Sequence, residues 1–584
     1  MTEKRILYSS EILPEFDRKF FESDDIATVI GTGYLGGKAS GLILMKEAVA
    51  DSFKSDSKQV ISVNIPRLIV LATDVFDAFM DQNNLYDMAL SEAADDQIAH
   101  AFQEAKLPVD IVGDLMALIS AVHSPLAIRS SSLLEDAIYE PFAGVYETKM
   151  IPNNQPDKDS RFRVLIEAVK FVYASTFAQN ARQYFKALGR SLAEEKMAVI
   201  IQEVIGRPFG DLFYPHLSGV ARSYNYYPTG RAKQEEGVVD LALGLGKTIV
   251  DGGLVWTYSP TYPRLAPVVG STAELVKKTQ TEFWAVNMGK PPEYDPIRET
   301  EYLIAAPLKR AEEDKTLGLL ASTYRPQDDR LVTGTGPDGP RVMTFAPILA
   351  DNIIPLNETI KALLKKSEAV VGSEVEIEFA VTLNTTGEIT ANLGFLQVRP
   401  MAVSKAEIMV LDEEMQGDKV LAASRKSLGN GVFNNIEDIV YVVPETFEAA
   451  HSRTIAHEIG LINQELTAEG RKYLLIGFGR WGSADPWLGI PVVWSQISGS
   501  SVIIEATLPK MNVELSQGSH FFHNLISFKI CYIMVEHTGP GLIDWTWLES
   551  RPEKLRTQFV RHVCLEKPLT VKVDGRTGRG VILK

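Results

Sequence analysis

Short apolar runs alternate with helical repeats of apolar residues along the first 400 residues. Apolar runs at 27–30, 67–72, 197–204 and 236–243 have the length of buried strands. Between them, residues 161–188 carry apolar side chains at three- and four-residue intervals, which predicts one long amphipathic helix. This alternation of strands and helices predicts an α/β (α+β) fold.

Two segments with strict two-residue alternation lie at 375–381 and 394–399, and a polar NTTGE turn joins them. The pattern predicts a β-hairpin. Because side chains alternate between the two faces of a strand, its polar positions share one face. These positions are Glu376, Glu378, Gln397 and Arg399. Two carboxylates, an amide and a guanidinium suit Mg²⁺ and a polyphosphate. The alternative is the solvated face of an ordinary hairpin.

The pattern changes after Pro400, where residues 401–420 are polar and helix-prone. A second set of predicted elements follows, with strands near 438–443, 473–478 and 501–506 and a helix near 519–535. We therefore place a domain boundary at about 400–415.

Composition places the chain among ordinary globular proteins. Its 584 residues are 45% hydrophobic and 23% charged, which is enough for several buried cores. Cys531 and Cys564 are the only cysteines, too few for a disulfide scaffold or a cysteine-rich zinc site. The N-terminal sequence lacks the apolar core of a signal peptide, and no run of about 18 apolar residues occurs. We therefore expect a cytoplasmic protein without a membrane span.

The chain is acidic, with 75 Asp and Glu against 59 Lys and Arg and a net charge of −16. Such a balance disfavours non-specific nucleic-acid binding, which depends on neutralising phosphates. A phosphate ligand would require basic residues gathered locally.

Two glycine patterns resemble nucleotide motifs only in part. Gly31, Gly33 and Gly36 spell the dinucleotide fingerprint G-x-G-x-x-G, but no acidic residue closes a second strand about 20 positions on. The sequence from Gly244 to Thr248 ends like a P-loop, yet Leu241 stands where that motif requires glycine.

Two basic residues stand at better-supported positions. Lys38 lies in the sequence GGKASG at a predicted helix start, where an ammonium group can meet a nucleotide phosphate. Arg129 ends an apolar strand and precedes three serines, an arrangement suited to an anion. The alternatives are a solvated surface lysine at position 38 and a structural salt bridge from Arg129 to Glu135 or Asp136.

Seven segments occur in the order LGGKASGL, AIRSSSLLEDAIYEPFAGVYET, AVKFVYASTFAQNARQYF, MAVIIQEVI, LSGVARSYNYYPTG, LALGLGKTIVDGG and EIEFAV…GFLQVRPMAV. In this order they resemble the nucleotide-binding domain of the phosphoenolpyruvate synthase and pyruvate phosphate dikinase family, which has the ATP-grasp fold. The resemblance covers roughly residues 30–405. The first 25 residues are polar with scattered aromatics, which indicates an N-terminal extension at 1–25. The resemblance implies an ATP-grasp domain at 26–405, followed by a C-terminal α/β domain at 406–584 as a candidate phosphohistidine-type domain.

The resemblance also implies a ligand contact for each matching residue, with ATP and Mg²⁺ as cofactors. Contacts with the ATP phosphates are implied for Lys38, Arg129, Gln397 and Arg399. Contacts with Mg²⁺ are implied for Glu376 and Glu378. Contacts with the adenine are implied for Gln202, Glu203 and Val204. Two departures from the family concern the triphosphate or acceptor side: Lys247 replaces an acidic residue, and Asn225 to Pro228 replace an aspartate–proline pair.

In this family the ATP-grasp domain phosphorylates a histidine on a mobile domain and releases AMP. The usual histidine motif is absent here, but His520 follows Ser519 and opens a predicted helix. Free backbone N–H groups and the helix dipole can stabilise a phosphoryl group there. His520 is therefore the candidate catalytic histidine, with Arg129 and Arg399 as the candidate catalytic cations. The alternative is a capping or packing histidine.

The segment from Gly477 to Pro486 places glycines, Arg480 and Ser483 after a predicted strand, which suggests a phosphate cradle. Trp481 and Trp487 could stack on a planar acceptor, or the segment could be a tight turn with core tryptophans.

After residue 405 about 180 residues remain, fewer than the roughly 250 of the (β/α)₈ barrel that holds the acceptor in the pyruvate enzymes. The resemblance thus implies an ATP-dependent, AMP-forming kinase of the dikinase type, acting on an unidentified small molecule or protein. The alternatives are an ATP-binding subunit that serves a separate partner protein and a regulatory nucleotide-binding module. A homo-oligomer is compatible with either.

Overall fold

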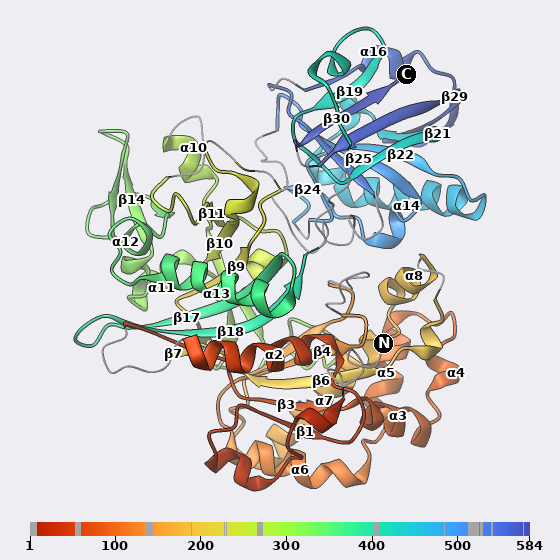
Figure 1. Ribbon diagram of the computed structural model, residues 1–584. Helices are drawn as coiled ribbons and strands as arrows, with labels where there is room; N and C mark the ends of the chain where they lie inside the picture. The colour runs from red at the N-terminus through yellow and green to blue at the C-terminus, as the bar shows by residue number, and fades with distance from the viewer. Residues whose placement is uncertain are drawn as a thin grey trace. The chain divides into compact units, whose positions relative to one another are not determined.

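The computed structural model describes residues 9–52, 60–135, 144–187, 190–226, 228, 231–265, 272–401, 408–483, 485–511, 525, 530–538, 541–575 and 577–584. The chain forms two compact units (Figure 1). Unit 1 comprises Met1–Ile249 and Leu254–Met401, and unit 2 comprises Val250–Gly253 and Ala402–Lys584.

The first sheet of unit 1 has five strands in the order β1-β3-β6-β4-β5. They are β1 (Ala27–Ile30), β3 (Leu68–Leu71), β6 (Met197–Glu203), β4 (Leu126–Ser132) and β5 (Thr148–Ile151). β1 and β3 are parallel, and the other neighbours are antiparallel. The strands predicted at 27–30, 67–72 and 197–204 are confirmed.

The helices beside this sheet are α2 (Gly36–Ser52), α3 (Thr73–Gln82), α4 (Tyr86–Ala89), α5 (Asp95–Glu104), α6 (Val109–Ala121), α7 (Lys158–Ser175) and α8 (Gln179–Ala187). The single helix predicted over 161–188 is wrong, because α7 ends at Ser175 and α8 begins at Gln179. The N–H of Thr176 donates to the carbonyl oxygen of Tyr173, which tightens and ends the last turn of α7. The Asp95 carboxylate accepts from Gln179 N at 2.7 Å and so starts α8.

The second sheet of unit 1 has six strands in the order β11-β10-β9-β17-β18-β2. They are β11 (Trp256–Tyr258), β10 (Val238–Ala242), β9 (Leu217–Arg222), β17 (Val375–Asn384), β18 (Thr390–Pro400) and β2 (Ile61–Asn64). β17 and β18 form the predicted hairpin, and Gly387 turns it with φ +86°. The strand predicted at 236–243 is confirmed as β10.

The described residues of unit 1 also form two smaller sheets and further helices. One sheet joins β13 (Leu303–Pro307), β12 (Glu282–Asn287), β8 (Leu212–Tyr214) and β7 (Arg207–Phe209). The other joins β15 (Arg330–Thr333), β14 (Ala321–Arg325) and β16 (Arg341–Met343). The helices are α9 (Lys247–Val250), α10 (Thr272–Lys277), α11 (Leu308–Glu313), α12 (Ala346–Leu349) and α13 (Leu356–Val371).

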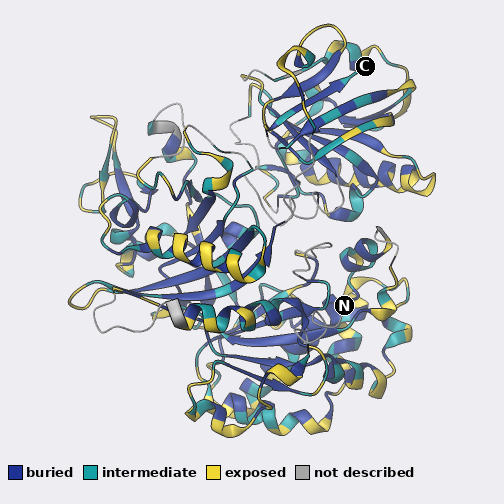
Figure 2. Cartoon of the chain, in the orientation of Figure 1, coloured by how far each residue is buried: buried dark blue, intermediate teal, exposed yellow. Residues whose placement is uncertain are grey.

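Helix α2 ties the first sheet to the second. It packs against β4 and against β18. Its apolar side chains Leu42, Met45 and Val49 recur at helical spacing and belong to one core cluster with residues of both sheets. Figure 2 shows that the strands are largely buried, whereas exposed residues follow the outer faces of helices such as α13. The first residues of α2 therefore lie where the two sheets meet.

Unit 2 is built on one large sheet in the order β20-β26-β25-β22-β21-β29-β30-β19-β27, and β28 pairs with β29. Its strands are β19 (Val420–Ser424), β20 (Ser427–Leu428), β21 (Asn430–Val442), β22 (Tyr473–Phe478), β25 (Ser500–Ala506), β26 (Cys531–Val535), β27 (Leu542–Ile543), β28 (Glu553–Arg556), β29 (Val560–Asp574) and β30 (Arg579–Leu583). β21, β22, β25 and β26 run parallel, and the remaining pairs are antiparallel. The described part of unit 2 also contains a two-stranded ribbon, β23 (Arg480–Trp481) with β24 (Gly489–Ile490), and the helices α14 (Ser452–Ala468) and α16 (Trp545–Glu549).

The strands predicted in the C-terminal third are confirmed as β21, β22 and β25. The helix predicted near 519–535 is wrong over Cys531–Val535, which form the buried strand β26. The rest of that segment, except Leu525 and Ile530, lies outside the described residues. In a short apolar run, the sequence of a buried helix cannot be distinguished from that of a strand buried on both faces, which explains the error.

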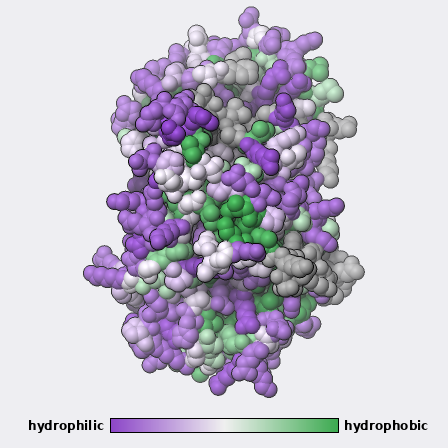
Figure 3. All heavy atoms as spheres, turned by 90° about the vertical axis from the view of Figure 1, so that its left-hand side faces the viewer, coloured by the Kyte–Doolittle hydropathy of each residue, from purple (hydrophilic) through white to green (hydrophobic). Residues whose placement is uncertain are grey.

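In the part of the chain that the structure describes, no helix is long and apolar enough to cross a membrane. On the side of the molecule that Figure 3 shows, hydrophilic residues cover most of the surface and hydrophobic residues gather in a cluster.

Candidate nucleotide site

The glycine-rich start of α2 lies directly against the end of β4. Gly36 has φ +75°, and a Cβ at this residue would stand 1.7 Å from the carbonyl oxygen of Ser131. A Cβ on Gly37 would stand 1.7 Å from the carbonyl oxygen of Glu135. Side chains are therefore excluded at both positions, and the backbone contact places Lys38 beside the serine segment.

Lys38 is held by a buried carboxylate. Its Nζ lies 2.7 Å from Oε1 of Glu135 and donates to Ser130 Oγ at 3.1 Å. The side chains of Lys38 and Glu135 are 13% and 1% exposed. The Ser132 N–H donates to the second oxygen of Glu135 at 2.9 Å. Lys38 is thus not a solvated surface lysine, and its ammonium group is fixed at the edge of β4.

Arg129 connects the first sheet to the β17–β18 hairpin. From β4, its Nη1 donates to the carbonyl oxygen of Leu396 at 2.8 Å and to Gln202 Oε1 at 3.3 Å. Its Nη2 donates to Gln397 Oε1 at 2.6 Å and lies 3.8 Å from Glu378 Oε2. The structure therefore brings together four of the residues that the sequence predicted for one site.

A β-bulge in the hairpin supplies one of these contacts. Glu378 faces Gln397 but Phe379 faces Phe395, so the register passes over Leu396. A bulged residue leaves the regular ladder. The Leu396 carbonyl accepts from Arg129 instead, which is a contact that sequence alternation alone could not predict.

The register confirms that the four polar hairpin residues share one face, since Glu376 faces Arg399 and Glu378 faces Gln397. The two glutamates have different surroundings, however. The Glu376 side chain is 1% exposed, and its two oxygens accept from Arg399 Nη2 and from Arg222 Nε. The Glu378 side chain is 19% exposed, and within the described part of the chain its one ion pair is the longer contact with Arg129.

Two further charged residues join this face and were missed in the sequence. Arg222 ends β9 and donates to Asp240 Oδ2 on β10 at 2.8 Å. Although burial acts to lower it, the pKa of Arg222 is raised because the carboxylates of Glu376 and Asp240 lie beside it. The available signals were a charged residue at the end of LSGVAR and one inside the apolar run VVDLAL.

The three residues predicted to contact the adenine do not all lie on the same face of the first sheet. Gln202 is buried, accepts from Arg129 and donates from Nε2 to the carbonyl oxygen of Pro66 at 3.2 Å. Val204 packs against an apolar cluster that contains Leu245. Glu203 points to the opposite face of the sheet, because alternate residues of β6 face opposite ways.

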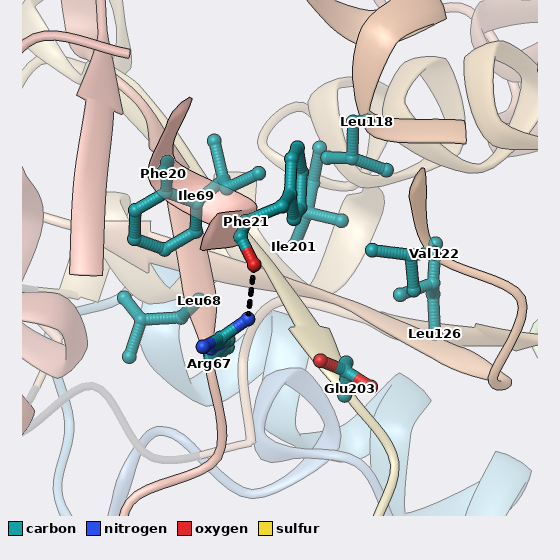
Figure 4. Close-up of a pocket in the computed structure, with 10 residues that line it drawn as sticks. All are labelled: Phe20, Phe21, Arg67, Leu68, Ile69, Leu118, Val122, Leu126, Ile201 and Glu203. Carbon is teal, nitrogen blue, oxygen red and sulfur yellow. Dashed lines mark hydrogen bonds between the residues drawn. The ribbon is translucent and has the colours of Figure 1, made fainter. Parts of the chain in front are cut away.

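That opposite face carries a small open pocket, lined by Phe20, Phe21, Arg67, Leu68, Ile69, Leu118, Val122, Leu126, Ile201 and Glu203 (Figure 4). Arg67 donates to the carbonyl oxygen of Phe21 at 3.2 Å across it. Glu203 Oε2 accepts from Ser124 Oγ at 2.6 Å. The Glu203 side chain is thus separated from Arg129 by the sheet itself.

The two glycine motifs do not provide a second nucleotide site of the dinucleotide or P-loop kind. The N–H groups of Thr32 and Gly33 donate to the Asp74 carboxylate, each at 2.9 Å, so a protein carboxylate occupies the place of a pyrophosphate. Lys247, which replaces an acidic residue of the family pattern, is paired with a carboxylate: its Nζ lies 2.9 Å from Glu299 Oε2.

Within the described ranges, no group of three or more His, Cys, Asp and Glu side chains could hold a metal ion. Mg²⁺ commonly keeps several waters and takes one or two carboxylates together with substrate phosphates. The partly exposed carboxylate of Glu378, beside the phosphate-site candidate Arg129, fits that requirement.

The structure describes only some of the candidate residues of unit 2. His520 lies outside the described residues. Trp481 is 2% exposed and donates from Nε1 to the carbonyl oxygen of Ile504 at 3.1 Å, so it is a core residue. Trp487 is 68% exposed. Arg480 donates to the carbonyl oxygen of Gly252, a residue of the same unit, at 2.9 Å.

Comparison with known families agrees with this arrangement. Residues 32–418 match the model of the pyruvate phosphate dikinase AMP/ATP-binding domain, which is more than half of the chain. The chain therefore belongs to this family, whose domain has an ATP-grasp-type fold and binds ATP or AMP.

One curated relative is a protein of Bacillus subtilis (strain 168) named "Uncharacterized phosphotransferase YvkC". The two sequences are 26% identical over 190 residues. This region is 32% of the present chain and 20% of the relative, so the similarity spans only a fifth of that protein.

Proposed function

We propose that this chain is an ATP-dependent phosphotransferase of the dikinase type. It would convert ATP and water to AMP and free phosphate, and pass the remaining phosphoryl group through a histidine to an acceptor. The observation that supports this most directly is the convergence of Arg129 with Gln202, Gln397 and Glu378 between the two sheets of unit 1. A small-molecule or protein acceptor and a cytoplasmic location belong to the same proposal.

The cations of the site would bind the ATP phosphates. Lys38, Arg129 and Arg399 supply three positive charges, and Gln397 supplies an amide. Phosphoryl transfer requires mainly positioning and neutralisation of charge, which such side chains provide. The adenine would lie beside Gln202, Val204 and the backbone of Glu203, because the Glu203 side chain faces the other way.

Glu378 is the proposed Mg²⁺ ligand on this chain. When bound, Mg²⁺ neutralises charge on the phosphates. The part of Arg129 is to orient the same phosphates from the β4 side, while Gln397 fixes the Arg129 guanidinium. Glu376 remains a candidate, although both of its oxygens already accept from arginines.

A labelling experiment tests the proposal. The protein is incubated with β- and γ-labelled ATP, nucleotides are separated, and the protein is treated with acid and base. We expect AMP as the nucleotide product and an acid-labile, base-stable label that is absent from His520→Ala. Formation of ADP alone would contradict a dikinase reaction. ATP binding without AMP or label would favour the regulatory module.

Three site variants complete the experiment. Lys38→Ala, Arg129→Ala and Arg399→Ala should each lower AMP formation by at least about 100-fold, since each removes charge stabilisation from the transferred group. Lys46→Ala is the matched control, because Lys46 lies on the same helix as Lys38 with a side chain that is 39% exposed. Turnover like the wild type in all three site variants would contradict the proposal.

A further inference from the structure

Four charged residues form a continuous row across four neighbouring strands of the second sheet. Asp240 lies on β10, Arg222 on β9, Glu376 on β17 and Arg399 on β18. Arg222 contacts Asp240 at 2.8 Å and Glu376 at 2.6 Å, and Glu376 accepts from Arg399. Charges alternate along this row, which we call the charge row, and its formal charges cancel.

The charge row is buried along its whole length. The side chains of Asp240 and Arg222 are 5% exposed, Glu376 is 1% exposed and Arg399 is 3% exposed. Thr257 on β11 adds a hydrogen bond of 2.6 Å to the other oxygen of Asp240. Buried charges require partners, and removal of one partner leaves its neighbour uncompensated. Each residue of the charge row therefore fixes the next.

The register explains how the row reaches the candidate site. Arg222 faces Glu376 across the β9–β17 pair, and Glu376 faces Arg399 across the hairpin. Directly opposed side chains lie on the same face of a sheet. Gln397 and Glu378, two residues along their strands, share this face and contact Arg129. The charge row thus ends beside the groups that meet Arg129.

We propose that Arg222 is a positioning residue, which holds Glu376 as the buried anchor of Arg399. Glu378 is then the one member of the glutamate pair that takes the divalent cation. This inference rests on the proposed function, and it assigns different parts to two glutamates that the sequence presents as equivalent.

The contacts give the physical reason. To bind a cation, a Glu376 oxygen would have to give up a hydrogen bond from Arg222 or from Arg399, and a buried guanidinium would lose a carboxylate partner. Glu378 gives up no such bond, since its ion pair with Arg129 is 3.8 Å long. A cation therefore displaces less at Glu378 than at Glu376.

The matched pair Glu376→Gln and Glu378→Gln tests the assignment, together with Arg222→Lys. Two binding measurements are made on the full chain. Calorimetry gives the ATP affinity in EDTA, and electron paramagnetic resonance gives Mn²⁺ binding in the presence of a non-hydrolysable ATP analogue. Thermal unfolding of each variant shows whether it folds.

We expect Glu378→Gln to weaken Mn²⁺ binding by about tenfold or more, with ATP affinity in EDTA close to the wild type. Glu376→Gln and Arg222→Lys should weaken ATP binding in EDTA by about tenfold, the loss expected when one charged hydrogen-bond donor is misplaced. Their Mn²⁺ binding should stay within about threefold of the wild type, less than the loss of a ligand causes.

The inference is overturned if Glu376→Gln weakens Mn²⁺ binding as much as Glu378→Gln does. It is also overturned if Arg222→Lys and Glu376→Gln bind ATP in EDTA as tightly as the wild type. If Glu376→Gln does not fold, Arg222→Lys decides whether the inference holds. The lysine keeps the positive charge, but its single ammonium group cannot bridge two carboxylates as the planar guanidinium does. A wild-type chain that binds no ATP would instead contradict the proposed function.

Discussion

The cations of the candidate site are of two kinds. Lys38 and Arg399 each contact a buried carboxylate, Glu135 and Glu376 respectively. Arg129 donates to two amides and a carbonyl group, and among the described residues the carboxylate paired with it, that of Glu378, is 3.8 Å away. The first kind is fixed but electrically compensated, whereas the charge of Arg129 is compensated less. If the proposed function holds, we expect Arg129 to contribute most to anion binding, and the paired cations to contribute also to the stability of the fold.

The largest expected effect is a loss of folding stability when the buried carboxylate that pairs with Lys38 is removed. Glu135→Ala leaves Lys38 without its buried counter-ion, so we expect the free energy of unfolding to fall by about 3–5 kcal/mol. Urea unfolding measures this loss. A fall of less than about 1 kcal/mol, the range of surface ion pairs, would show that Lys38 finds another partner.

The next effect concerns Arg129. Arg129→Met should lower kcat/KM for ATP by about 100- to 1000-fold, because it removes a donor aimed at developing charge. Its unfolding free energy should fall less than that of Glu135→Ala, since most of its partners are neutral. Steady-state kinetics and urea unfolding of the same preparations give both values. A larger stability loss in Arg129→Met would reverse the comparison.

A third prediction uses Glu195, which is buried near Glu135. Burial raises the pKa of Glu195 to about 7, while hydrogen bonds from Ser132 and Tyr146 act to lower it and Glu135 acts to raise it. The folded protein therefore holds this proton more tightly than the unfolded chain. Its contribution to stability is fully present below the unfolded pKa and is lost as pH rises through 7, by about 3 kcal/mol in total.

Glu195→Gln should remove this dependence, so that the variant becomes more stable than the wild type above pH 7. Urea unfolding from pH 5 to 8.5 measures the difference. Parallel pH profiles for the two proteins would show that Glu195 is ionised in the folded state throughout.

The smallest effect on the free energy of unfolding is expected at Lys46, on the exposed side of α2, the helix that also carries Lys38. Lys46 lies 3.9 Å from Asp25, and their side chains are 39% and 51% exposed. Lys46→Ala should change the free energy of unfolding by less than about 1 kcal/mol, because exposed ion pairs are screened by water. If it costs as much as Glu135→Ala, burial is not what distinguishes the two lysine pairs.

Much of the site could be predicted from the sequence because its signals are local. The alternation in β17 and β18 placed Glu376, Glu378, Gln397 and Arg399 on one face, and the register confirms it. The sequence GGKASG predicted a helix start at Lys38, and α2 begins there, at Gly36. Strands such as β6 and β22 are continuous apolar runs bounded by polar residues, so their positions were predicted correctly.

The remaining features depend on tertiary contacts. The bulge at Leu396 follows from how the hairpin meets Arg129, and no local pattern encodes it. Arg222 and Asp240 acquire their importance only when β9, β10 and β17 become neighbours. The division between α7 and α8 depends on Asp95, a residue far away in the sequence. In unit 2, burial on both faces made β26 resemble a helix.

The same bulge has a consequence for protein engineering. It fixes the register on the side of the hairpin that meets Arg129, whereas the far end is the turn from Asn384 to Thr390, where residues 385–388 are exposed. Loop tips of this kind accept insertions, because no ladder hydrogen bond has to shift. A fluorescent tag placed within 385–388 would therefore keep the pairing of Glu378 with Gln397, and its emission would offer a reporter on the strand that carries the candidate metal ligand.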